Sequence, residues 1–176
     1  MDQFVQRMIG AAKLDVATFE AVEHDQNATM HALAVVVLVA IATGLGSMAA
    51  AGFTGLIVGV IAAVVGWAIW AGLIWLIGTK LLPEKSTEAD WGQVARTTGF
   101  AQSPGLLRLF GFIPAVGPLI VLVASIWQLV AVVVAIRQAL DYTQTWRAVV
   151  VVLIGWLINL AIFMLLGTAM APVANG

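Results

Sequence analysis

Long uncharged, apolar segments separated by short charged stretches make up most of this chain. Residues 26–79 contain no Asp, Glu, Lys or Arg, and neither do residues 109–136 or 148–176. The first of these segments has 54 residues. As one helix it would be roughly 80 Å long, whereas the hydrocarbon core of a bilayer is about 30 Å thick. It therefore predicts two membrane helices joined by a turn, which the glycines and polar residues between Gly44 and Gly55 mark.

The same pattern predicts an all-α fold, a polytopic membrane helix bundle with five transmembrane helices. The segment 94–113 is ambiguous, because it contains Arg96 and Arg108 and could also form a re-entrant or interfacial helix. Pro104 is expected to kink it. One domain, residues 31–168, is expected to follow a cytoplasmic segment 1–30 and to precede a short external tail, 169–176. Its helices are predicted at residues 31–50, 55–79, 94–113, 118–138 and 148–168.

The distribution of basic residues favours five spans over four. Lys and Arg prefer the cytoplasmic side of a membrane. With five spans, seven of the eight basic residues lie on the side of the N-terminus and only Arg108 lies on the other. With four spans, Arg137 and Arg147 would change sides. We therefore expect five spans, with the N-terminus in the cytoplasm and the C-terminus outside. Arg108 is expected to snorkel outward.

Residues 1–30 predict two short helices on the cytoplasmic face and are not a signal peptide, because they are acidic and have no apolar central region. Asp15 is well placed to cap the second helix. The first helix has an apolar face, typical of a helix lying in the membrane interface. That face consists of Phe4, Val5, Met8, Ile9, Ala11 and Ala12.

Composition supports the membrane interpretation. Hydrophobic residues make up 62% of the 176 positions and charged residues 10%, and the mean hydropathy is +1.04. Soluble domains carry about 25% charged residues, so an ordinary soluble enzyme is excluded. The net charge of −1 gives no basic surface for nucleic acid. The chain has no cysteine, which excludes disulfides and thiol chemistry.

The acidic segment before the first span has two interpretations. Glu20 and His24 lie one helical turn apart and could share a metal ion, with His31 as a third ligand across a bend. The interpretation we favour is a solvated acidic helix, with Glu23 as a further acidic residue. No nucleotide-binding loop and no Ser/His/Asp set is recognisable. We therefore expect no metal, no cofactor and no enzymatic activity.

The second predicted span carries small residues at Gly55, Gly59 and Ala63. Small residues at this spacing let two helices approach closely. We expect the stripe to pack against another helix of the same chain, with a dimer contact as the alternative.

Gln128 and Asn159 are uncharged polar residues within the last two spans. Counted from the outer boundary, their depths differ by two residues, or roughly 3 Å of helix rise. Because amides in hydrocarbon seek partners, we expect the two side chains to hydrogen-bond to each other. The alternative is a solute path that these two residues line together with Arg108.

Four segments carry a family resemblance. They are residues 14–25 (LDVATFEAVEHD) with 28–29 (AT), 99–107 (GFAQSPGLL), 113–118 (IPAVGP) and 125–127 (SIW). These segments resemble the Yip1-domain family, in particular its short bacterial members. The resemblance implies five spans with a cytosolic N-terminus, and with it we expect a protein of the bacterial inner (cytoplasmic) membrane. Eukaryotic members of that family are linked to vesicle trafficking and contact prenylated Rab-type GTPases.

Together these features favour a non-enzymatic, membrane-organising or trafficking-like scaffold that contacts the lipid bilayer and forms a homo-oligomer. One alternative is a small-solute or ion permease or channel subunit, which predicts a hydrated cavity at the intramembrane polar residues. The other is an adaptor that binds an unidentified protein through its acidic N-terminal helix, which would then stand free of the bundle.

Overall fold

The computed structural model describes residues 2–170, without the side chains of residues 48–51, 162–163 and 165–170. Within that range all regular structure is helical, which confirms the all-α prediction. The predicted tail lies outside the described residues except for its first two positions. The elements are α1 (Gln3–Ala12), α2 (Val16–His24), α3 (Ala28–Gly46), α4 (Met48–Leu76), the π-helical turn η1 (Ile77–Leu81), α5 (Trp91–Phe100), the 3₁₀ helix η2 (Ser103–Phe112), α6 (Gly117–Ala139) and α7 (Thr145–Met170).

The long helices have the length and composition of membrane helices. Among the described residues, three stretches are long and apolar enough to cross a bilayer: Ala28–Gly46, Gly52–Leu81 and Gly117–Ala139. The first part of α7, Thr145–Ala161, is a shorter apolar stretch. The predicted turn falls at Ser47. A kink follows at Gly52, whose φ of 64° is readily adopted only by glycine.

The predicted span 94–113 is built from two short helices rather than one. The chain leaves α5 at Ala101 and begins η2 at Ser103, with Pro104 in the first turn, where a missing N–H is tolerated. The two pieces follow α3. A β-carbon on Gly99 would lie 2.8 Å from the Ala32 β-carbon, and one on Gly46 would overlap the Arg108 carbonyl oxygen. Residues 99–111 therefore run along α3 from near its first turns to its last.

The bundle has two chemically different ends. One carries the loops at residues 82–90 and 140–144, and we refer to it as the polar end. The other carries the turn at Ser47 and the connection 113–116, and we refer to it as the apolar end.

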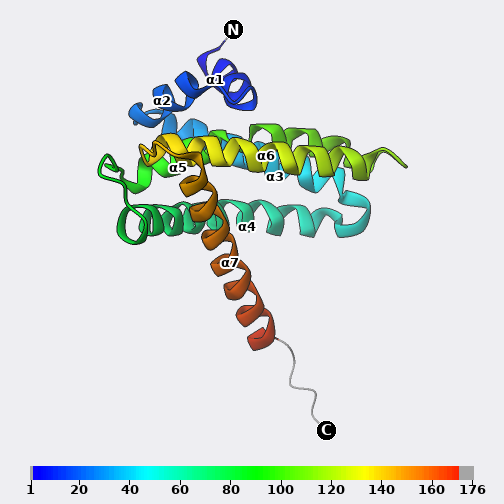
Figure 1. Ribbon diagram of the computed structural model, residues 1–176. Coiled ribbons are helices and arrows are strands. Elements are labelled where there is room, and N and C mark those ends of the chain that lie inside the picture. The colour runs from blue at the N-terminus through cyan, green and yellow to red at the C-terminus, as the bar shows by residue number, and fades with distance from the viewer. Residues whose placement is uncertain (1, 171–176) are drawn as a thin grey trace.

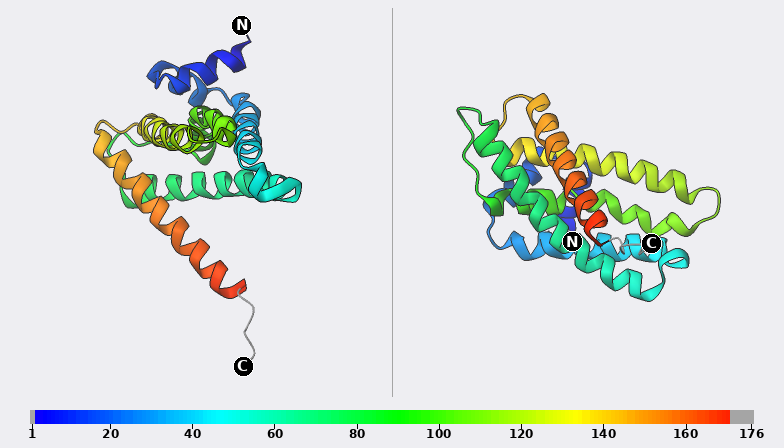
Figure 2. Two further views of the ribbon diagram at one scale, coloured as in Figure 1. Left: turned by 90° about the vertical axis from the view of Figure 1, so that its right-hand side faces the viewer. Right: turned by 90° about the horizontal axis from the view of Figure 1, so that it is seen from below.

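The helices are arranged in layers (Figure 1). The middle layer contains α3, α5, η2 and α6, with α1 and α2 on one side of it and α4 on the other. From the polar end, α7 crosses α4 and then leaves the bundle, as Figure 1 and the left view in Figure 2 show. Its outer part accordingly exposes large apolar side chains: Trp156, Leu157, Leu160 and Met164.

Small residues and indole hydrogen bonds hold the layers together. Alanines on one face of α6 are fully buried, which allows close helix packing. Three tryptophans join α4 to α5 and the loop before it. The Nε1 of Trp67 donates to Ala95 O at 3.2 Å, that of Trp75 to Ala89 O at 2.9 Å, and that of Trp91 to Ala68 O at 3.2 Å.

Candidate functional site

A cavity of about 490 Å³ lies between α3, α4, η2 and α7. It extends from the turn at Ser47 to Trp70, near the middle of the bundle. Five of the six candidate residues from the sequence line this cavity: Gly55, Gly59, Ala63, Arg108 and Asn159. The sixth, Gln128, does not.

Arg108 turns toward the interior of the bundle. Its Nη2 donates to Ser125 Oγ on α6 at 3.2 Å, and its Nη1 lies near Gly105, one turn earlier in η2. Ser125 lies eight residues after the first residue of α6, Gly117, and so well away from the apolar end. The predicted outward snorkelling of Arg108 is therefore wrong. In a 3₁₀ helix, residues three apart are eclipsed, so the side chain lies over Gly105, which leaves room for it.

Gln128 and Asn159 do not face each other. The Gln128 amide nitrogen donates to Gln102 Oε1 at the start of η2. Asn159 points to the cavity on the other side of η2. The predicted pairing is therefore wrong. The expectation compared depths along two helices only. The break between α5 and η2 brings the Gln102 amide next to Gln128.

The small residues of α4 line the cavity rather than a helix contact. A β-carbon placed on Gly59 would meet no atom within 4 Å, and the same holds for Gly66, about two turns farther along α4. Within one chain, Gly59 and Gly66 are therefore not in contact with a neighbouring helix, in contrast to our expectation for Gly59.

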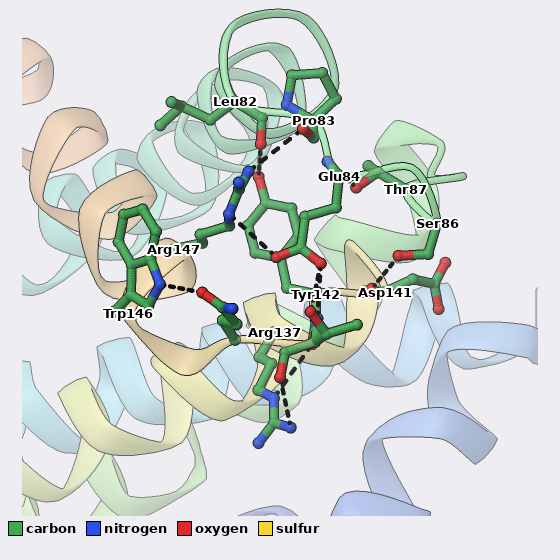
Figure 3. A network of polar contacts seen from close by, with 12 residues as sticks. Leu82, Pro83, Glu84, Ser86, Thr87, Arg137, Asp141, Tyr142, Trp146 and Arg147 are labelled. Carbon is green, nitrogen blue, oxygen red and sulfur yellow. Dashed lines mark hydrogen bonds and ion pairs between the residues drawn. The ribbon is translucent and has the colours of Figure 1, made fainter.

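The polar end is closed by a network of hydrogen bonds and one ion pair (Figure 3). The Tyr142 hydroxyl lies 3.1 Å from Gly78 O and 2.8 Å from Leu82 O and can donate to either. One carboxylate oxygen of Glu84 accepts from the Thr143 N–H at 3.0 Å and hydroxyl at 2.7 Å, and the other lies 3.2 Å from Arg147 Nε.

These contacts tie the loop after η1 to the loop between α6 and α7. The hydrogen bonds from Thr143, together with the charge of Arg147, lower the pKa of Glu84. Burial raises the pKa of Tyr142 to about 12, so its hydroxyl keeps its proton at any physiological pH. At neutral pH the Glu84 carboxylate is therefore ionised and the Tyr142 hydroxyl is protonated, as their hydrogen bonds require.

A family model for the Yip1 domain matches residues 16–166 of the chain. That stretch includes both loops of the polar end and every residue that lines the cavity. The chain belongs to the Yip1 domain family. This family is membrane-associated and non-enzymatic, in agreement with the apolar helices. No curated protein and no solved structure matches the chain.

In this Yip1-domain protein, α1 precedes the matched region and packs on its flank. Phe4 contacts His31 and Phe100 with ring centroids 5.3 and 6.4 Å apart, and Trp127 Nε1 donates to Ala12 O at 2.7 Å. The predicted apolar face is divided between two surroundings. Phe4, Met8 and Ala11 pack on the bundle, whereas Val5 and Ile9 are exposed.

The acidic helix α2 is docked on the Yip1 bundle. Asp15 caps it as predicted, by accepting from the Thr18 N–H at 3.2 Å. Its apolar residues Phe19 and Val22 are fully buried. Glu23 is buried as well, and its carboxylate accepts from Gln93 Nε2 at 3.0 Å. The helix therefore packs on the bundle and does not stand free of it.

The possible metal ligands of the Yip1-domain protein do not converge. His24 Nδ1 lies 2.9 Å from the Glu20 carbonyl oxygen, and the Glu20 carboxylate accepts from Gln138 Nε2 at 3.3 Å. His31 packs against Phe4. Within residues 2–170, no group of three or more His, Asp or Glu side chains could hold a metal ion.

Three structural roles could not be assigned from the sequence. Gln102 is the partner of Gln128, and Arg96 donates to the Glu23 carbonyl oxygen, with 3.1 Å from its Nε. Tyr142 joins two loops that are 60 residues apart in sequence. A signal was present for this last role, since Tyr142 is the single tyrosine of the chain and lies in a loop between apolar helices.

Proposed function

We propose that this Yip1-family protein is a non-enzymatic scaffold that organises the membrane by self-association through α7. The uncovered apolar surface of α7 carries this proposal. This helix is joined to the bundle at its polar end, where Gly155 lies against Ile74, but its outer part exposes Leu153, Trp156 and Leu157. A neighbouring α7 from a second copy would cover that surface.

Two further features support a scaffold rather than a catalyst. The charged and polar groups of the polar end are engaged with one another, so they form a rigid cap. Most of the exposed large apolar side chains among the described residues lie on α4, α6 and α7. Contacts with lipids and with other membrane helices are therefore the interactions for which this surface is suited.

For the orientation we propose five spans, with α5 and η2 together forming the third. The N-terminus and the polar end would lie in the cytoplasm, and the apolar end outside the inner membrane. The support is the distribution of basic residues, since Lys and Arg favour the cytoplasmic side.

Single-cysteine crosslinking in native membranes tests self-association. The chain has no cysteine, so each variant carries one thiol. We expect at least one of Leu153→Cys, Leu157→Cys and Leu160→Cys to give a disulfide-linked dimer upon oxidation. The matched control is Leu129→Cys on α6, whose side chain is 55% exposed, against 59% for Leu157. Equal dimer yields for α6 and α7 variants would indicate random collision and exclude the proposed interface.

A further inference from the structure

The cavity contains a cation that lacks an acidic partner. Arg108 lines it, and the only hydrogen bond of its guanidinium within the described residues goes to the neutral Ser125. Asp and Glu are absent from residues 26–83 and 91–140 and from all residues after Asp141, so none of the helices around the cavity carries a carboxylate. A cation among apolar helices is costly unless an anion or polar groups compensate it.

Two amides of the cavity can donate to such an anion. Asn159 makes no hydrogen bond within the described residues, and the Gln102 oxygen is engaged by Gln128, which leaves the Gln102 amide nitrogen free to donate. The hydroxyls of Thr43 and Ser47 already donate to backbone carbonyls at 2.8 and 3.0 Å, so they offer only lone pairs. A group that is rich in acceptors and negatively charged, such as a phosphate, can pair with Arg108 and accept from both amides.

The rest of the cavity is apolar and elongated. Gly59 and Gly66 leave open space beside α4 over roughly 10 Å of helix rise. Leu56, Trp70 and Trp156 contribute apolar walls. The volume of about 490 Å³ is in the range of pockets that hold organic ligands and is far larger than an inorganic anion needs.

We propose that this cavity binds an anionic phospholipid from the surrounding bilayer. The lipid phosphate pairs with Arg108, and the Gln102 and Asn159 amides donate to headgroup or ester oxygens. An acyl chain lies along α4 beside Gly59 and Gly66. The site is complete within one chain, so the inference goes beyond the scaffold function and does not require self-association.

Native mass spectrometry of the full-length protein in detergent tests the proposal. The probes are dioleoyl phosphatidylglycerol, dioleoyl phosphatidylcholine and inorganic phosphate, each added to delipidated protein. We expect one phosphatidylglycerol per chain to be retained with an apparent Kd at least about tenfold lower than that of phosphatidylcholine. The reason is that a charge-assisted hydrogen bond to a net anionic headgroup is not offset by a choline cation.

Two pairs of variants assign the binding to the cavity. Arg108→Met should abolish the preference for phosphatidylglycerol, whereas Lys80→Met removes an exposed cation at the polar end and should leave it unchanged. Gly59→Leu fills the open space without a change in charge and should weaken retention. Val58→Leu, on the exposed face of the same helix, should not.

Each contrary result overturns the proposal. Equal retention of the two lipids by the wild-type chain would remove the phosphate–arginine pairing. An unchanged preference in Arg108→Met, in protein that still elutes as a folded species, would move the anionic site elsewhere. Retention of inorganic phosphate that matches that of the lipid would assign the cavity to a soluble anion. The crosslinking result for α7 has no bearing on any of these outcomes.

Discussion

Among the acidic residues that the structure describes, Glu23 has a pKa far above its ordinary value. Its side chain is 3% exposed, and Arg96 donates to its carbonyl oxygen rather than to its carboxylate. Burial, assisted by the negative charge of Asp141, raises its pKa from 4.5 to about 7. Nearby Glu20 also raises the pKa, whereas Arg96 and His24 lower it. The joint between α2 and α5 therefore contains a carboxyl group that titrates near neutral pH.

The first prediction concerns the effect of pH on this joint. Because the pKa of Glu23 is higher in the folded chain, the protonated form is the stabilising one. Its contribution is complete below about pH 4.5 and is lost as the pH rises through about 7. Stability should therefore fall by on the order of 1–2 kcal/mol between pH 5.5 and pH 8. Thermal unfolding of purified protein in dodecyl maltoside at these two values measures the change.

Glu23→Gln should remove most of this loss, because an amide keeps an acceptor for Gln93 and cannot ionise. Glu20→Gln, at an exposed position of the same helix, is the matched control and should retain the loss. The backbone carbonyl of Glu20 raises the pKa of His24, which titrates in the same direction, so both variants are compared in a His24→Gln background. An undiminished pH effect in Glu23→Gln would contradict the assignment.

Between elements, η2 approaches the end of α3 very closely. Gly46 is the last residue of α3, and the Arg108 backbone occupies the space that a side chain there would need. By contrast, Gly59 in α4 faces open space. The two glycines belong to the same sequence class, a glycine in an apolar helix, but the structure gives them opposite roles.

The second prediction compares these two positions. Gly46→Ala should push η2 away from α3 and lower stability by about 1–3 kcal/mol, or roughly 3–10 °C in Tm for a chain of this size. Gly59→Ala should cause no loss, because its methyl group meets no atom and alanine favours the helix. Thermal unfolding in the same detergent gives both values. A loss in Gly59→Ala as large as that in Gly46→Ala would contradict the open space beside α4.

The position of most helices could be predicted from hydropathy and charge, whereas their partners could not. The expected helix 118–138 agrees with α6 within one residue at each end. The segment expected to form one helix, 94–113, is helical in two pieces, α5 and η2, and its break at Ala101 depends on how Gly99 and Gly46 let the chain pack on α3. Hydropathy measures the free energy of transferring a side chain into an apolar phase. That free energy does not depend on which apolar neighbour the side chain meets, so it does not identify the helix that packs against it.

The same reasoning explains the candidate site. Arg108, Asn159 and the small residues of α4 are recognisable as unusual in an apolar span, and the structure brings them to one cavity. The pairing of Gln128 with Gln102 and the inward direction of Arg108 depend on the rotation of η2 about its axis. A segment with 3₁₀ geometry has a different side-chain period from an α-helix, and its rotation therefore could not be counted from the sequence.

At the scale of the whole molecule, the polar end and the apolar end lie at opposite ends of α3. Lys85 is exposed in the polar-end loop, and Val116 is 49% exposed in the connection at the apolar end. A five-span chain places these two positions on opposite sides of the bilayer. A four-span chain, in which 94–113 does not cross, places them on the same side.

The third prediction uses this difference. In bacterial spheroplasts, a membrane-impermeant maleimide should label Val116→Cys directly and Lys85→Cys only after the membrane is permeabilised. The wild-type chain should not react with the maleimide, because it has no cysteine. Labelling of both positions only after permeabilisation would favour four spans. Labelling of Lys85→Cys alone in intact spheroplasts would reverse the orientation.

The packing of its first half also determines how α7 can move. Tyr142, Glu84 and Arg147 fix the start of this helix to η1 and the loop that follows it, and Gly155 lies against Ile74 of α4, while Figure 1 shows the outer part leaving the bundle. The 15 residues of α7 beyond Gly155 are about 22 Å long. A rotation of about 10° near Gly155 displaces the far end by roughly 4 Å. We therefore expect the angle between α4 and the outer part of α7 to respond to lateral pressure in the leaflet that surrounds this part.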